Sequence, residues 1–148
     1  MHYQVQTFSE LTNREVYRML QLRSEVFVVE QTCIYQDMDN KDIDALHVLG
    51  TSSNEICAYA RILSTSKVPG EVAIGRVITS HSHRGKGEGH RLMAFCMNYV
   101  KERFACPSVR ISAQEHLATF YASHGFEITG NNYLEDGIPH CEMLYTPK

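Results

Sequence analysis

In the stretch "HSHRGKGEGHR" (residues 81–91), Gly85, Gly87 and Gly89 alternate with charged side chains. The apolar run "VAIGRVITS" (residues 72–80) precedes this stretch, and "RLMAFCMNYV" (residues 91–100), which has the apolar spacing of a helix, overlaps its end. Glycine allows backbone N–H groups to approach an anion closely, and the first turn of a helix leaves such groups unpaired. A glycine loop between a strand and a helix therefore predicts an anion site, most often for phosphate.

Two widespread phosphate-binding patterns do not fit this loop. It lacks the G-x-x-x-x-G-K-[ST] of a P-loop, and His90 stands where a Rossmann fingerprint counted from Gly85 needs its third glycine. The strands expected before the loop also follow one another without a helix between them, unlike a βαβ unit. Taken alone, the loop suits a solvated turn as well as an anion site.

The residues before the loop predict a strand, a helix and an antiparallel meander. "HYQVQTF" (residues 2–8) alternates as a strand does, and Ser9 is expected to cap a helix within residues 10–31. Residues 33–44 are acidic and irregular, which favours a loop. Three strands are then expected at residues 45–52, 55–64 and 71–80, with "SSN" and "KVPG" as the turns between them.

The residues after the loop predict two helices and three strands. A helix is expected from about Gly87 to Phe104, and Pro107 then breaks the chain. A strand at residues 109–114 and a helix at residues 115–124 follow, the helix ending before Gly125. Strands at residues 126–129 and 140–146 are joined by the loop "GNNYLEDGIP". The predicted order is β-α-β-β-β-α-β-α-β-β, in one domain that spans residues 1–148.

Composition narrows the class of protein. With 148 residues, 43% of them hydrophobic, and a formal net charge of −3, the chain lacks the basic field expected of a nucleic-acid-binding protein. The start "MHYQVQTFSE" is too polar for a signal peptide, and no apolar run reaches membrane-spanning length, so we expect a cytoplasmic protein without a membrane contact. Five cysteines without a Cys-x-x-Cys pair indicate neither a disulfide framework nor a zinc site, and the histidines around the loop have no metal-ligand spacing.

Arg84-x-x-Gly87-x-Gly89, placed between a strand and a helix, resembles the [QR]-x-x-G-x-[GA] signature of the GNAT superfamily of acyl-CoA-dependent N-acyltransferases. The predicted order of elements is similar to that fold, and "FYASHGF" (residues 120–126) resembles its segment between helix four and strand six. "LRSEVFVVEQTCIYQDMD" (residues 22–39) and "YLEDGIPHCEM" (residues 133–143) resemble the ElaA-like branch. The resemblance implies an α+β, three-layer fold. In that fold, the mixed, mostly antiparallel sheet has six to seven strands and is splayed between strands four and five. About four helices accompany the sheet.

The resemblance also implies a coenzyme A site and assigns residues to it. The pyrophosphate is expected on the backbone of Arg84, Gly85, Lys86, Gly87, Glu88 and Gly89, with the Glu88 side chain pointing away. The pantetheine arm is expected along the edge formed by Val77, Ile78 and Thr79, with Gln114 near it. A backbone N–H of Val77 or Ile78 would polarise the thioester carbonyl.

For the chemistry, Tyr121 matches the tyrosine that protonates the leaving thiolate in many members of the superfamily. The base stays open. Many members carry a glutamate near the catalytic edge of strand four, but here Ala73, Gly75 and Arg76 occupy that place. The candidates are therefore Glu71 earlier in the strand, Glu30, His140, or a water molecule.

The acceptor is expected between two acidic segments. One carries Asp37, Asp39, Asp42 and Asp44, and the other carries Glu135 and Asp136. Such residues attract a cationic amine, although a solvated acidic surface explains them equally well. Glu30, Asp37, Asp136 and His140 are the predicted acceptor contacts. The expected activity is acetyl transfer from acetyl-CoA to a primary amine, as a monomer or a homodimer, and the alternative is an acyl-CoA sensor without turnover.

Overall fold

The computed structural model describes residues 1–64 and 69–148. Its strands and helices follow the predicted order, and the expected turn "KVPG" begins outside the described residues. The elements are β1 (His2–Thr7), α1 (Asn13–Arg23), β2 (Leu46–Ser52), β3 (Glu55–Leu63), β4 (Glu71–Thr79), α2 (Glu88–Arg103), β5 (Ser108–Gln114), α3 (Ala118–Ala122), β6 (Glu127–Glu135) and β7 (Ile138–Tyr145).

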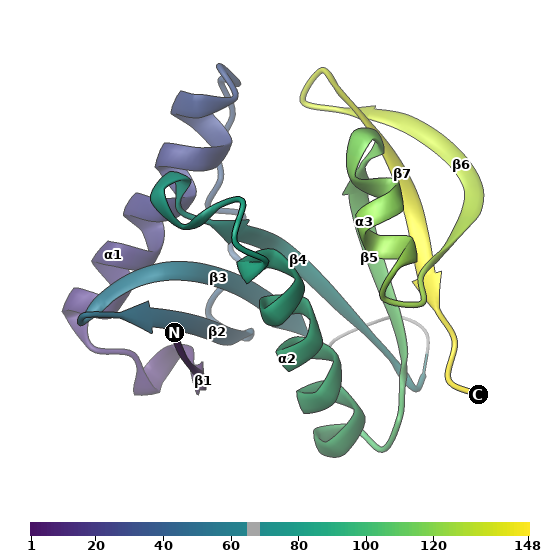
Figure 1. The fold of residues 1–148 in the computed structure, drawn as a ribbon, viewed down its shortest axis with the longest axis horizontal. Helices are drawn as coiled ribbons and strands as arrows, with labels where there is room; N and C mark the ends of the chain where they lie inside the picture. The colour runs from purple at the N-terminus through teal and green to yellow at the C-terminus, as the bar shows by residue number, and fades with distance from the viewer. Residues whose placement is uncertain (65–68) are drawn as a thin grey trace.

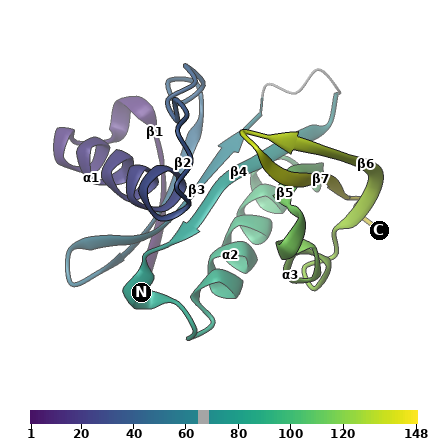
Figure 2. The ribbon, with the colours of Figure 1, turned by 90° about the horizontal axis from the view of Figure 1, so that it is seen from above.

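The strands form one seven-stranded sheet in the order β1-β2-β3-β4-β5-β7-β6 (Figure 1). The β4–β5 pair is parallel and all other pairs are antiparallel, which confirms the mixed, mostly antiparallel sheet. Helices α2 and α3 cover one face and α1 covers the other, as the view in Figure 2 shows. Apolar side chains fill both interfaces: Leu92, Met93 and Val109 on the α2 face, and Met19 and Leu49 on the α1 face.

The sheet opens between β4 and β5. These strands pair at three positions, Glu71 with Ser108, Val72 with Val109, and Ala73 with Arg110. Beyond them the two strands diverge toward the top of Figure 1. The expected splay is thereby confirmed, and it leaves one edge of β4 from Ile74 onward without a neighbouring strand in the described residues.

The first helix begins later than predicted, because Thr12 rather than Ser9 caps it. Thr12 Oγ1 accepts the Glu15 N–H at 3.1 Å, while Glu15 Oε1 accepts the Thr12 N–H at 2.9 Å. This reciprocal capping box satisfies two backbone donors that a helix start leaves unpaired. Ser9 instead lies in a short 3-10 turn, Phe8–Glu10.

Three further predictions need correction. The described residues contain three α-helices rather than about four: α1 continues as π-helical turns at Ser24–Glu30, and residues 31–45 hold no second helix. The helix expected at residues 115–124 is a 3-10 turn followed by the short α3. Much of "GNNYLEDGIP" is strand, since β6 extends to Glu135 by pairing with β7 and only Asp136 and Gly137 form the turn.

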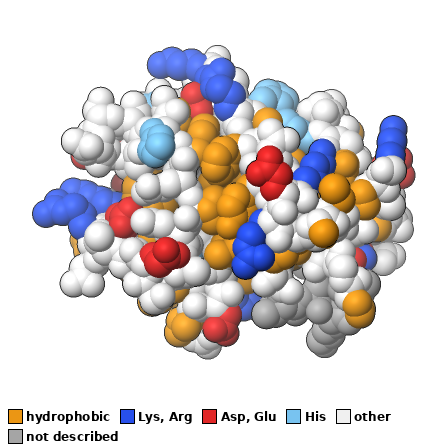
Figure 3. Space-filling model, turned by 90° about the horizontal axis from the view of Figure 1, so that it is seen from below, with side chains coloured by type: hydrophobic (Ala, Val, Ile, Leu, Met, Phe, Trp, Pro, Cys, Tyr) orange, Lys and Arg blue, Asp and Glu red, His pale blue; other side chains and the backbone are white. Residues whose placement is uncertain are grey.

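None of the helices in the described ranges is long and apolar enough to cross a membrane. Figure 3 shows the molecule from below, where apolar side chains gather across the middle of the face and charged side chains of both signs lie around them. That face carries no stripe of a single charge.

Candidate functional site

A cleft of about 800 Å³ occupies the opening of the sheet. It is lined by the open part of β4, the facing part of β5, α3, the segment after α1, and the β6–β7 turn. Arg84 of the loop at residues 80–87 and Gly89 at the start of α2 line this cleft, whereas Gly85, Lys86 and Gly87 lie outside its lining. Figure 1 shows the loop leading into α2 beside the diverging strands. The splay therefore brings the predicted cofactor loop, Tyr121 and His140 around one space.

The glycine loop has the backbone conformation that an anion cradle needs. Gly85 and Gly87 have φ values of +76° and +80°, which side-chain-bearing residues rarely adopt. Gly87 is the residue directly before α2, so the unpaired N–H groups of the helix start follow it. A Cβ on Gly85 would meet nothing within 4 Å, which leaves the loop surface open to a ligand. These features fit the pyrophosphate of coenzyme A.

Arg84 does not reach freely into that cradle. Its guanidinium donates two hydrogen bonds of 2.7 Å to the Glu30 carboxylate, and it also donates to the Thr79 carbonyl at 3.1 Å. The hydrogen bonds from Arg84 lower the pKa of Glu30. Glu30 is thus held as an ionised partner of the loop, which argues against its predicted roles as base and acceptor contact.

Glu88 is engaged away from an anion bound by the loop, as expected. Its carboxylate accepts hydrogen bonds from Tyr3 Oη in β1 and from Arg91 Nε at 2.9 Å, and these bonds lower its pKa. Arg91 also donates to the Lys86 carbonyl at 2.6 Å. The two contacts of Arg91 tie the loop to the first turns of α2.

Strand β4 contains a bulge in its pairing with β3, which the sequence did not indicate. Tyr59 in β3 pairs with Ile78, but Arg61 pairs with Gly75, so Arg76 and Val77 together lie opposite Ala60. Arg76 accommodates the extra residue with a φ of +53°. The predicted pantetheine edge, residues 77–79, begins directly at this bulge.

Tyr121 lies in the wall of the cleft on α3 and is 7% exposed. Its ring packs edge-on against Phe120 at 5.0 Å and Phe126 at 6.0 Å between centroids. Burial raises the pKa of Tyr121 to about 12, so the phenol keeps its proton at neutral pH. No side chain of the described residues hydrogen-bonds its Oη, which leaves that proton available to a ligand.

His140 also lines the cleft, on β7. Its Nδ1 lies 2.7 Å from the Ile138 carbonyl oxygen, and its Nε2 lies 3.2 Å from Glu135 Oε2. The ring stacks on Tyr133 with 6.1 Å between centroids. An Nδ1–H that donates to the Ile138 carbonyl leaves the lone pair on Nε2, which lies beside Glu135.

Two contacts join the sides of the cleft. Gln114 Nε2 at the end of β5 donates to Gln31 Oε1 at 3.1 Å, and Cys33 Sγ approaches the Asp136 carbonyl at 3.4 Å. The Gln114 amide is therefore committed to Gln31. Asp136 contributes its backbone to this bridge from a turn with a φ of +51°.

Glu71 lies at the closed end of the splay, outside the lining of the cleft. Its carboxylate accepts hydrogen bonds of 2.7 Å and 3.1 Å from Arg110. We therefore no longer assign Glu71 as the base, because an ionised, paired carboxylate at that end is remote from the open edge.

The acidic segment after α1 is neutralised by arginines instead of facing an acceptor amine. Arg23, which is fully buried, binds Asp37 at 2.7 Å and Asp42 at 2.8 Å. The other pairs are Arg61 with Asp39 at 2.8 Å, Arg61 with Asp42 at 3.0 Å, Arg76 with Asp37 at 2.8 Å, and Arg76 with Asp39 at 3.5 Å. These pairings argue against Asp37 as an acceptor contact, and of the four aspartates Asp44 alone is exposed. The sequence did not indicate these ion pairs, because the arginines lie far from the aspartates along the chain.

We expect Asp42→Asn to lower the free energy of unfolding by about 2–3 kcal/mol, because buried Arg23 and Arg61 lose a charged acceptor. Burial opposes ionisation of Asp42, but the hydrogen bonds from both arginines outweigh it and lower its pKa. This stabilisation is present above the ordinary aspartate pKa and is lost as the pH falls through the lowered one. Urea denaturation measures the change. Asp44→Asn is the matched control, with an expected change within about 0.5 kcal/mol, and equal losses in the two variants would contradict the prediction.

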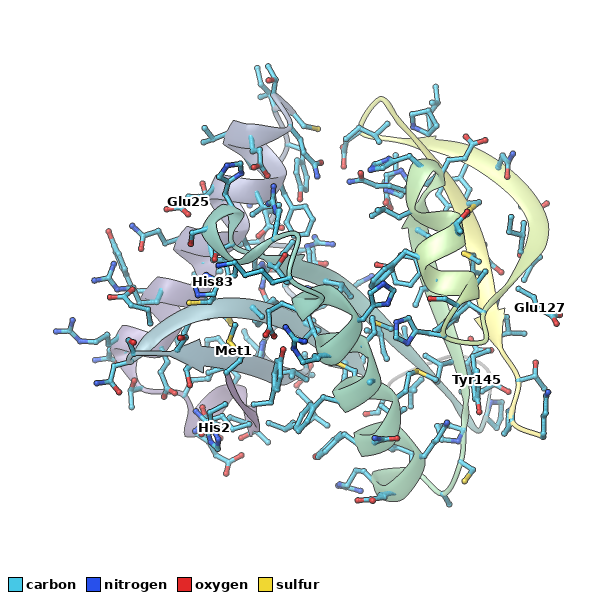
Figure 4. The ribbon with its side chains drawn as sticks, in the orientation of Figure 1. Met1, His2, Glu25, His83, Glu127 and Tyr145 are labelled. Carbon is cyan, nitrogen blue, oxygen red and sulfur yellow. The ribbon has the colours of Figure 1, made fainter. Side chains whose placement is uncertain are left out.

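Histidines near the loop are engaged with neighbours. His83, labelled in Figure 4 on the loop before α2, has its Nδ1 2.8 Å from Ser80 Oγ. His90 Nδ1 lies 3.0 Å from His124 Nε2. Across residues 1–64 and 69–148, no three histidine, cysteine or acidic side chains are grouped to hold a metal ion.

Comparison with known proteins identifies the family. Residues 4–147 match the acetyltransferase (GNAT) domain model. Protein ElaA from Escherichia coli (strain K12) is 44% identical over 137 residues, covering 91% of this chain and 90% of ElaA. The crystal structure of an acyl-CoA N-acyltransferase from Pseudomonas aeruginosa has a TM-score of 0.92 with 39% identity, covering 98% of this chain and 99% of that one.

Two further structures agree with this match. The crystal structure of Escherichia coli ElaA has a TM-score of 0.91 with 42% identity, covering 97% of this chain and 98% of that one. An aminoglycoside 6'-N-acetyltransferase complexed with coenzyme A shares the fold alone, with a TM-score of 0.73 and 13% identity over 97% of this chain and 96% of its own. From its sequence match over nearly the whole length and from these structures, the chain belongs to the GNAT acetyltransferase family and has ElaA among its homologues.

Proposed function

We propose that the protein transfers an acetyl group from acetyl-CoA to a primary amine, by direct attack of the amine while both substrates are bound. The observation that carries this proposal is the meeting of three features at one cleft. The glycine loop, which contributes Arg84 to the wall of the cleft, the unpaired strand edge and the protonated Tyr121 all border the opening between β4 and β5.

The loop and the strand edge supply the acetyl-CoA site in this proposal. N–H groups around Gly85, Gly87 and Gly89 bind the pyrophosphate, where the helix start favours negative charge. The edge at residues 77–79 pairs with the pantetheine amides as a neighbouring strand would. The coenzyme A bound by the aminoglycoside 6'-N-acetyltransferase, which shares this fold, supports the class of ligand.

Tyr121 assists the departure of the thiolate. The amine nitrogen forms a bond to the acetyl carbon, the C–S bond breaks, and the sulfur gains electron density. Full proton transfer from a phenol with a pKa of about 12 to a thiolate whose acid has a pKa near 8.5 costs roughly 5 kcal/mol. We therefore assign Tyr121 as the hydrogen-bond donor that stabilises the developing thiolate, which solvent then protonates.

His140 is the side chain best placed to take the proton of the amine. Glu71 and Glu30 are both held by arginines, whereas His140 Nε2 faces Glu135 in the wall of the cleft. The proton moves from the attacking nitrogen to Nε2, directly or through one water molecule, with Glu135 beside the ring.

The test is release of free thiol from acetyl-CoA in the presence of a panel of primary amines. We expect release that depends on the amine and rises with pH as the amine loses its proton, with a control that omits the amine. His140→Gln should lower kcat by about 10²-fold, while the pH dependence that comes from the amine itself should persist. Binding of acetyl-CoA without release across a broad panel would favour the sensor function instead.

A further inference from the structure

We propose that Asp37 and Arg76 form a latch that connects the segment after α1 to the part of β4 that polarises the thioester. The inference rests on the proposed transferase function and assigns both residues as positioning residues for it. Asp37 lies in the segment after α1 and Arg76 lies in the open part of β4, 39 residues away. The two side chains meet beside the cleft.

The backbone of Arg76 is strained. A residue with a Cβ is disfavoured in the left-handed region, and Arg76 has a φ of +53°. Such a conformation persists when surrounding contacts hold it. Glycine would adopt it without strain, yet the neighbouring Gly75 is not the residue with positive φ. The conformation of Arg76 therefore depends on what its side chain binds.

The side chain of Arg76 is bound firmly by Asp37. Arg76 Nε donates to Asp37 Oδ1 at 2.8 Å, and its Nη2 donates to the Asp37 carbonyl oxygen at 2.9 Å. The guanidinium also lies 6.0 Å from the centroid of the Phe27 ring. Hydrogen bonds to a charged group are stronger than neutral ones, and two of them from one guanidinium offset the strain of its backbone.

Asp37 is itself held in place by a buried residue of the core. Arg23, fully buried on α1, donates to Asp37 Oδ2 at 2.7 Å, so the two carboxylate oxygens are shared between Arg23 and Arg76. Tyr35 Oη donates to the same carboxylate at 3.1 Å. A chain of contacts thus leads from α1 through Asp37 to the bulge.

The consequence concerns the direction of a backbone N–H. In an unbulged strand, alternate N–H groups point to β3 and to the open edge, and the extra residue at Arg76 and Val77 shifts that alternation by one. The latch keeps the shifted N–H aimed into the cleft, where it donates to the carbonyl of the bound thioester. Without the latch, β4 relaxes toward a regular pairing with β3 and the donor turns away.

The experiment is infrared difference spectroscopy of acetyl-CoA labelled with ¹³C at the carbonyl, bound to the wild type, Arg76→Ala, Asp37→Asn and the double variant. We expect the bound carbonyl band of the wild type to lie below that of free acetyl-CoA. Each variant should lose most of this shift, and kcat should fall by about 10–100-fold with the KM for acetyl-CoA changed less than about threefold. The double variant should be no worse than the poorer single variant.

Arg110→Ala is the matched control, since it removes an arginine paired with two carboxylates at the closed end of the same strands. It should keep the full band shift. Arg76, which is 23% exposed, can be replaced without opening the core, and it keeps the test open if Asp37→Asn fails to fold. An unchanged band in Arg76→Ala overturns the latch alone, whereas a wild type that binds no acetyl-CoA overturns the proposed function as well.

Discussion

Replacing Gly87 with valine is expected to weaken acetyl-CoA binding by at least about 100-fold. Gly87 has a φ of +80° directly before α2, and a β-branched residue strongly disfavours that conformation. A Cβ there would lie 3.4 Å from Arg91 Nη1, so the damage comes from the backbone and not from a collision. The loss of two charge-assisted hydrogen bonds costs about 3 kcal/mol or more, which corresponds to the stated change in affinity. Titration calorimetry with acetyl-CoA measures it.

Gly70→Val provides the matched control for the strain. Gly70 has a φ of +76° in the turn before β4, and a Cβ there would meet nothing within 4 Å. Both variants therefore carry a similar backbone penalty, while Gly70 lies before β4 and is not part of the glycine loop. Affinity should change less than about threefold in Gly70→Val. If Gly87→Val binds as tightly as Gly70→Val, the phosphate cradle is elsewhere.

Tyr121→Phe is expected to lower kcat by about 10²-fold or more while leaving the dissociation constant of acetyl-CoA nearly unchanged. The substitution removes the one proton that the side chain offers to the departing sulfur and keeps the ring that packs against Phe120 and Phe126. Because no described residue hydrogen-bonds the hydroxyl, its removal should not lower the free energy of unfolding by more than about 1 kcal/mol. Single-turnover thiol release and calorimetry separate the two effects.

Tyr145→Phe is the control for Tyr121→Phe, because it removes a tyrosine hydroxyl from a ring that also packs on Phe126, outside the lining of the cleft. It should retain the wild-type kcat.

The pH dependence of the free energy of unfolding gives a second check on Tyr121. Since burial raises the pKa of Tyr121 to about 12, the stability that it contributes is complete below its ordinary pKa of 10 and is lost as the pH rises from 10 to about 12. An activity that is equal in Tyr121→Phe and in the wild type would remove Tyr121 from the mechanism.

The sequence predicted those features that are encoded locally. Strands β2 to β5 and helix α2 follow from apolar periodicity, and the loop follows from glycines at positions that need unusual backbone angles. The capping box at Thr12 and Glu15 was equally readable, because its spacing is a local signal. By contrast β6, whose residues are exposed along its whole length, carries no buried face and so resembles a loop in sequence.

The partners of the charged side chains were not predictable in this way. Asp37 looks the same in sequence whether it attracts a substrate amine or holds an arginine, and its partners Arg23 and Arg76 lie 14 and 39 residues away. The structure argues against Asp37 as an acceptor contact for that reason, and against Glu71 as the base because Arg110 reaches it from the neighbouring strand. The bulge at Arg76 also lacked a signal, since its left-handed residue is not the adjacent glycine.

The three residue pairs that join β4 to β5 give the molecule a seam. A four-stranded block, β1 to β4, and a three-stranded block, β5 to β7, meet there, with two side-chain contacts spanning the far end. In the proposed function, the pantetheine arm pairs along the open edge of β4 as a neighbouring strand would, and it thereby bridges the two blocks. If the protein binds acetyl-CoA as proposed, binding links the two blocks and should raise the melting temperature.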